Sequence, residues 1–147
     1  MSCVSFVSPE QRARLAAATT QLSLEEVQAQ HPSPPVTEGT KHRIKLMATS
    51  ADPAIRASAG LHRHAPDEVL TQLATDAEES VRCAVARNQG TPTPLLRQLA
   101  KDPSDTVRGW VAAHESTPAD LLDAMSEDPA VLVREVVAWN RRWPAHT

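Results

Sequence analysis

The chain has 147 residues, of which 41% are hydrophobic and 22% charged, a composition typical of a water-soluble globular protein and not of a disordered one. Its formal net charge of −3 argues against a strongly basic binder of nucleic acid or of membrane surfaces. With one Phe, three Trp and no Tyr, the core must be built from Leu, Val and Ala, which favours helices over a β-sandwich.

The N-terminal forty residues predict two short helices followed by a linker. Ser8 and Ser23 each begin a capping-box pattern, so we expect residues 1–30 to form an N-terminal helical cap or, alternatively, an arm that recruits a partner. The Pro-rich stretch 31–40 is typical of an extended linker. The segment shows no secretory signal, and no apolar run in the chain could span a bilayer. We therefore expect a cytoplasmic protein without a membrane partner.

A repeat of 26 residues fills the rest of the chain, residues 41–147, and aligns four times without a gap. Arginine recurs in every unit after a β-branched residue, and proline recurs ten residues after each arginine. These two columns are Arg56, Arg82, Arg108 and Arg134, and Pro66, Pro92, Pro118 and Pro144. Several columns at one unbroken spacing indicate one supersecondary unit repeated in line.

Each unit predicts two helices and no strand. Val81, Ala84 and Val85 follow the helical spacing, and a second helix is expected from Pro92, with Thr91 as its N-cap. One such unit is too small to bury its own apolar face, so neighbouring units must stack. The sequence predicts an all-α fold: a short α-solenoid of about four two-helix repeats with an N-terminal helical cap.

Three segments of the chain, each followed by a proline, resemble the leucine-rich repeat variant family. They are LATDAEESVRCAVARN, LAKDPSDTVRGWVAAH and MSEDPAVLVREVVAWN. The resemblance implies a right-handed superhelix of paired short helices, one of each pair 3₁₀-like. The spacing Asp-x4-Val-Arg is also similar to that of HEAT repeats. Some members of the family hold an iron–sulfur cluster in a cysteine-rich N-terminal segment, whereas this one has only Cys3 there, so no cofactor is predicted.

The charged columns predict a structural ladder. An Asp near the start of each first helix can satisfy free N–H groups, and the Arg six residues later can reach a neighbouring Asp. The predicted ladder consists of Asp76, Asp102, Asp128, Arg56, Arg82, Arg108 and Arg134.

A column of His62, Asn88, His114 and Asn140 ends the first helices, and we expect its side chains to bond backbone groups of the turn. No metal site is predicted, because Asn is a poor transition-metal ligand.

Arginines at the turns offer an alternative function, a nucleic-acid-binding HEAT-like solenoid. They are Arg63, Arg87, Arg141 and Arg142. Against this, the repeats from Leu46 onward hold ten Lys and Arg against fourteen Asp and Glu, and Glu115 interrupts the row. Nucleic acid is therefore the less favoured partner.

No phosphate-binding glycine loop, HExxH or GxSxG motif is present, so no catalytic residue and no enzyme are predicted. The favoured function is a non-catalytic scaffold that binds another protein, with partner and oligomeric state left open. We expect the partner on the variable positions of the second helices, which we place on the concave side, and at Trp139, which otherwise closes the last repeat. The candidate residues are Gln72, Arg97, Gln98, Asp120, Asp123 and Trp139. Trp110 is expected to fill the core locally.

Overall fold

The computed structural model describes residues 35–142 together with residues 10 and 13. Within that part of the chain all regular structure is helical, which confirms the predicted all-α class. The helices are α3 (Glu38–Ala48), α4 (Pro53–Leu61), α5 (Asp67–Leu73), α6 (Glu79–Arg87), α7 (Thr93–Leu99), α8 (Asp105–Ala113), α9 (Ala119–Met125) and α10 (Val131–Arg142). None of these helices is long and apolar enough to cross a membrane.

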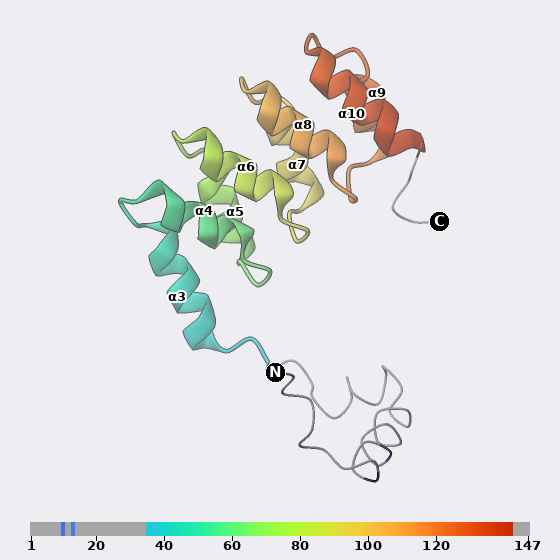
Figure 1. The fold of residues 1–147 in the computed structure, drawn as a ribbon. Helices are drawn as coiled ribbons and strands as arrows, with labels where there is room; N and C mark the ends of the chain where they lie inside the picture. The colour runs from blue at the N-terminus through green and yellow to red at the C-terminus, as the bar shows by residue number, and fades with distance from the viewer. Residues whose placement is uncertain (1–9, 11–12, 14–34, 143–147) are drawn as a thin grey trace, which may run out of the picture. The chain divides into compact units, whose positions relative to one another are not determined.

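The first helices of the repeats, α4, α6, α8 and α10, pack directly on one another in chain order, as Figure 1 shows. The second helices, α5, α7 and α9, pack on the first helices, and no packing of comparable extent joins one second helix to the next. The second helices are seven-residue α-helices, whereas the family resemblance implied a 3₁₀-like element. This arrangement is that of a helical repeat solenoid. The handedness of its superhelix stays a prediction.

Three complete hairpins are present among the described residues, followed by α10 as the first helix of a fourth unit. Helix α3 is in register with the second helices, because Ile44 and Met47 stand 26 residues before Leu70 and Leu73. Ile44 is buried like Leu70, and α3 packs on both α4 and α5. Helix α3 therefore covers the beginning of the stack.

The core is one continuous cluster of Leu, Val and Ala from both kinds of helix. In the β-branched column, Val81, Val107 and Val133 have no exposed surface, whereas Ile55 is 41% exposed. The difference follows from position, since no first helix precedes α4 in the part of the chain that the structure describes. Burial in this column thus depends on the first helix of the preceding unit, since Val133 is buried although no described unit follows α10.

The second helices begin one position later than predicted. Pro92 is the N-cap of α7, and Thr91 instead donates its hydroxyl hydrogen to the carbonyl oxygen of Val85, 2.7 Å away. Thr117 does the same to Val111 at 2.6 Å. Thr91 is therefore not the N-cap that the sequence predicts. Both threonines satisfy a carbonyl near the end of the first helix, which needs a partner once the helix stops.

The predicted N-terminal cap, residues 1–30, lies outside the described residues except for Glu10 and Ala13, both helical and exposed. Residues 31–34 of the predicted linker and residues 143–147 of the predicted repeat domain lie outside them as well. The predicted linker, residues 31–40, is shorter than expected at its C-terminal end, because α3 begins at Glu38. The side chain of Thr37 accepts the N–H of Thr40 and so caps this helix.

Candidate functional site

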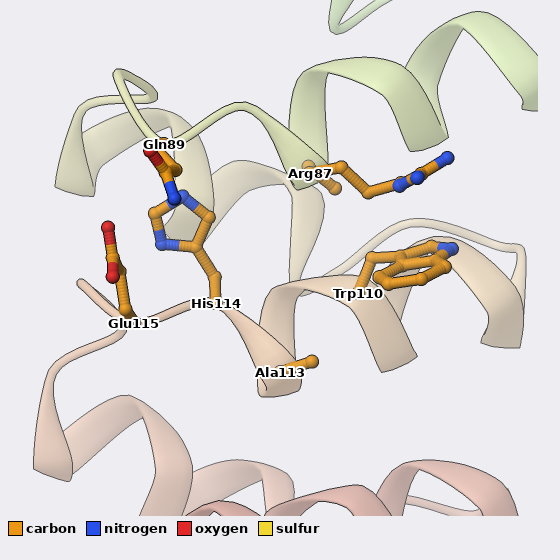
Figure 2. A pocket seen from close by; sticks show the side chains of 7 residues that line it. Arg87, Gln89, Trp110, Ala113, His114 and Glu115 are labelled. Atoms are coloured by element: carbon orange, nitrogen blue, oxygen red, sulfur yellow. The ribbon is translucent and has the colours of Figure 1, made fainter. Parts of the chain in front are cut away.

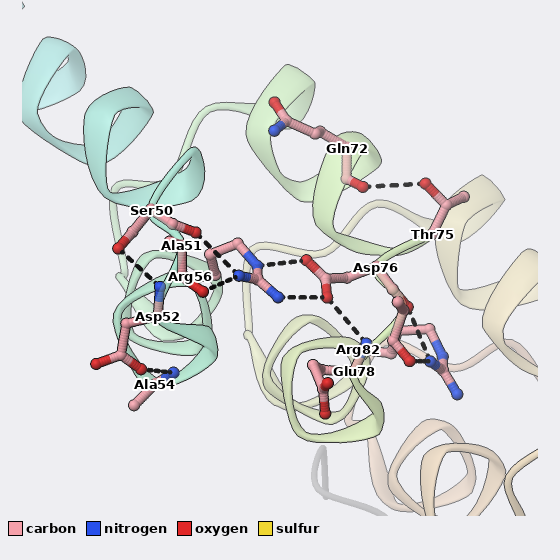
Figure 3. Close-up of polar contacts among 11 residues, drawn as sticks. Ser50, Ala51, Asp52, Ala54, Arg56, Gln72, Thr75, Asp76, Glu78 and Arg82 are labelled. Atoms are coloured by element: carbon pink, nitrogen blue, oxygen red, sulfur yellow. Dashed lines mark hydrogen bonds and ion pairs between the residues drawn. The ribbon is translucent and has the colours of Figure 1, made fainter.

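The Arg and Asp columns form a ladder that links successive units, and Figure 3 shows its rung between Arg56 and Asp76. Arg82 donates from Nε to Oδ2 of Asp102 at 2.7 Å and from Nη2 to Oδ1 at 3.2 Å, while its Nη1 donates to the carbonyl oxygen of Asp76 at 2.8 Å. The same three bonds join Arg56 to Asp76 and Ser50, and Arg108 to Asp128 and Asp102. Each Asp stands twenty residues after its Arg, in the next unit.

The sequence predicts that these aspartates satisfy the free N–H groups of the helices that follow them. In the structure they are not the N-caps of those helices. Oδ1 of Asp102 accepts the N–H of Ser104 at 2.9 Å, and Ser104 is the residue that caps α8. Asp76 and Asp128 bond the N–H two residues on in the same way. Each carboxylate therefore holds the turn before the helix and receives the guanidinium of the preceding unit, which is a structural task that every unit shares.

Acidification is expected to weaken this ladder. The hydrogen bonds from Arg56 hold the pKa of Asp76 below its usual value, and those from Arg108 do the same for Asp128. A carboxylate whose pKa is lower in the folded chain stabilises the fold above its unfolded pKa of about 3.9 and loses this contribution as the pH falls below it. Urea midpoints should therefore drop steeply below about pH 4.

Asp128→Asn provides the control for that titration, because it removes one of the two carboxylates while preserving the shape of the side chain. The variant should start from a lower midpoint at neutral pH and fall less steeply on acidification than the natural chain. Parallel curves for the two chains would show that this carboxylate does not contribute to the acid response.

The His and Asn column also joins units to one another. Nδ2 of Asn88 donates to the carbonyl oxygen of Gly60 at 2.6 Å, and Nδ2 of Asn140 donates to that of Ala112 at 2.7 Å. His114 bonds the carbonyl oxygen of Asn88 through Nε2 at 2.8 Å and accepts the N–H of Ser116 at Nδ1, so its Nε2 carries the hydrogen. Both ring nitrogens are occupied by backbone groups. In residues 35–142 no three His, Cys, Asp or Glu side chains gather as metal ligands.

The predicted partner-binding residues of the second helices are largely engaged with one another or with α10. Arg97 forms an ion pair with Asp120, at 2.8 Å between Nη2 and Oδ2, and Asp123 pairs with Arg141. Gln72 and Gln98 are exposed on α5 and α7. Trp139 lies apart from this set, on the exposed side of α10.

A groove that the sequence did not predict runs along the C-terminal ends of the first helices. Trp110 is 40% exposed, so the expectation that it fills the core is wrong. The guanidinium carbon of Arg87 stands 4.7 Å from the centre of its ring, within cation–π range (Figure 2). Trp110 occupies a column otherwise held by Ser58, Ala84 and Val136. A lone aromatic among small residues was the signal available in the sequence.

Two hollows meet at Arg87 and Gln89 and make up this groove. The first has a volume of about 230 Å³ and includes Trp110, His114 and Glu115 in its lining, as Figure 2 shows. The second has a volume of about 420 Å³ and includes Leu61 and Arg63. We call the surface formed by Leu61, Arg63, Arg87, Gln89, Trp110 and Glu115 the Trp110 groove.

The Trp110 groove carries charges of both signs beside the apolar ring of Trp110. Arg63 and Arg87 contribute positive charge, and Glu115 contributes negative charge at the other end. Of the remaining two arginines that the nucleic-acid alternative requires, Arg141 is paired with Asp123. The four turn arginines therefore do not make one uninterrupted basic stripe of the kind that tracks a phosphate backbone.

Comparison with known proteins supports the repeat assignment. The family model described as leucine rich repeat variant matches residues 80–104, which span most of α6, all of α7 and the turn that leads to α8. No curated protein and no solved structure matches the chain. The segment that matches contains Arg82 and Asp102, the two members of one rung of the ladder. The resemblance to the leucine rich repeat variant family that the sequence predicts is thus confirmed over residues 80–104.

Proposed function

We propose that this protein is a non-catalytic scaffold that binds an extended segment of another protein along the Trp110 groove. The observation that carries the proposal is the exposed ring of Trp110 beneath the guanidinium of Arg87, where the first hollow begins. Partly exposed Trp and Arg side chains beside a hollow are the residues that most often dominate the energy of a protein interface. The matching family supports a repeat scaffold.

The packing of the helices favours this face over the second-helix face. The first helices are packed closely on one another, whereas the second helices are not. In a curved stack the closely spaced layer is the inner one, so we assign the concave side to the first helices instead of the second. On the second-helix face, Arg97 and Asp120 already satisfy each other's charge. A partner would have to replace that ion pair to gain from either residue.

The charges of the groove define the chemistry of the partner segment. A carboxylate would pair with Arg63 or Arg87, and a neighbouring large apolar side chain would enter the hollow beside Trp110. Glu115 at the far end favours a basic residue there. We place this interaction in the cytoplasm. The free thiol of half-buried Cys83 suits a reducing compartment, and burial raises the pKa of that thiol, which lowers its reactivity.

The proposal can be tested by selecting peptides from a random displayed library on the immobilised full chain. Selected peptides should carry an acidic residue next to a large apolar one. Trp110→Ala should weaken the binding of a selected peptide by about thirtyfold, or about 2 kcal/mol, as measured by fluorescence anisotropy. Arg87→Ala should weaken it as well, because the variant removes both the stacking on the ring and the charge.

Arg97→Ala is the matched control, since it removes an exposed arginine from the other face. It should leave peptide affinity unchanged, and thermal melting should show that Trp110→Ala is folded. Selected peptides that bind Trp110→Ala as tightly as the natural chain, or that lose affinity only with Arg97→Ala, would refute the assignment to this groove.

A further inference from the structure

The outer face of α10 differs from the same face of the other first helices. Ala86 and Ala112 are fully buried, because the next first helix covers them, whereas Ala138 in the same column is exposed. Arg82 and Arg108 are half-buried in ion pairs, whereas Arg134 is exposed and pairs with no carboxylate among the described residues. This is the stacking face of a repeat, without a further repeat upon it in the part of the chain that the structure describes.

This face is also more apolar than its position in the repeat requires. Val131 is 58% exposed on this face, and Leu132, which flanks it on the side of Gly109 in α8, is 49% exposed. Their columns hold Glu79 and Asp105, and Ser80 and Thr106, in the two preceding units. Trp139 is 58% exposed on the same helix. Large exposed apolar side chains that replace charged and polar ones along one helix are characteristic of an interface.

The charges on this face can pair with the charges on the same face of a second copy of the chain. Glu135, Ala138, Trp139 and Arg142 line one hollow of about 270 Å³. Glu135 and Arg142 are seven residues apart, so they stand two helical turns apart on one side of the helix, with Ala138 and Trp139 midway between them. If two α10 helices cross in antiparallel fashion about that midpoint, each Glu135 faces the Arg142 of the other copy. Such self-complementarity is what a twofold interface requires.

We propose that the protein forms a twofold-symmetric homodimer through α10, centred on Ala138 and Trp139. The small side chain of Ala138 lets the two helix axes approach closely, and the ring of each Trp139 covers the Ala138 of the other copy. Two reciprocal ion pairs between Glu135 and Arg142 fix the antiparallel direction. The interface does not use the Trp110 groove, so it stands or falls independently of the proposed function.

A head-to-tail stack of copies, the other arrangement open to a solenoid, does not fit the ladder. Continuing the stack would require a first unit that offers a carboxylate to Arg134. The Asp column holds Ser50 at that place in the first unit, and α3 already packs on α4. A copy added in this way would leave the Arg134 guanidinium without a carboxylate partner. The twofold arrangement needs no carboxylate there.

Charge reversal tests the dimer directly in the full chain. Sedimentation equilibrium of the natural protein from micromolar to hundreds of micromolar should give twice the monomer mass at the upper end. Glu135→Arg and Arg142→Glu should each raise the dissociation constant at least tenfold, because each places like charges opposite each other. The double variant Glu135→Arg/Arg142→Glu should restore the dimer, since the pairs re-form with exchanged signs.

Cross-linking tests the geometry of the interface. Ala138→Cys should form an intermolecular disulfide rapidly on mild oxidation, because the twofold axis passes beside this residue. Ala124→Cys, at an exposed position on α9, is the matched control and should not. A monomer at all concentrations, polymers that grow with concentration, or a dimer that neither single reversal affects would each overturn the proposal. A dimer that the double variant fails to restore would overturn the antiparallel pairing.

Discussion

Replacing Arg108 by alanine is expected to lower the free energy of unfolding by about 2–4 kcal/mol. The Arg108 guanidinium makes two bonds to Asp128 in the next unit and one, at 2.8 Å, to the carbonyl oxygen of Asp102 in its own. The side chain of Asp128 is only 7% exposed. Without the arginine, a largely buried carboxylate keeps its charge and loses its counter-ion, which costs more than the loss of an exposed ion pair.

Urea unfolding followed by circular dichroism measures this loss, and Arg97→Ala is its control. Arg97 also forms an ion pair with an aspartate of the next unit, but both partners are well exposed to solvent. Its replacement should change the unfolding free energy far less. If Arg108→Ala instead abolished peptide binding while its urea midpoint stayed unchanged, the Arg column would be a binding array and the ladder interpretation would be wrong.

The repeated columns made the fold predictable, because each column reports one shared environment several times. The 26-residue period predicted paired helices, and the recurrence of Arg and Asp predicted that these charges are structural. The 26-residue period alone does not predict which Asp carboxylate each Arg side chain bonds. Arg82 is close in sequence to Asp76 but bonds the carboxylate of Asp102 and only the backbone carbonyl of Asp76. The choice between the carboxylates of Asp76 and Asp102 depends on how successive units are placed in space.

The Trp110 groove could not be predicted from the repeat, because its residues do not recur from unit to unit. Trp110 stands in a column of small residues, and the spacing that buries Ala84 on α6 gives no warning that a larger ring at the same place must turn outward. The position of Arg87 over that ring depends on the approach of α6 to α8. The charged second-helix positions looked available because the pairing of Arg97 with Asp120 crosses units.

Replacing Ala112 by leucine is expected to lower the free energy of unfolding by about 3 kcal/mol. Ala112 lies on the face of α8 that α10 covers and has no exposed surface. The longer side chain must push α10 away, which also stretches the 2.7 Å hydrogen bond from Asn140 to the carbonyl oxygen of Ala112. Close packing leaves no volume to absorb three additional carbon atoms.

Ala138→Leu is the same substitution in the same column one repeat later, where the side chain is exposed. It should change the urea midpoint little when measured at protein concentrations low enough to keep the chain monomeric, because no helix in the described residues covers it. The difference between the two variants therefore isolates the contribution of stacking, since helix propensity and column chemistry are matched. Equal losses at the two positions would mean that leucine is unfavourable in this column whatever covers it, and the dependence of burial on a neighbouring unit would have to be abandoned.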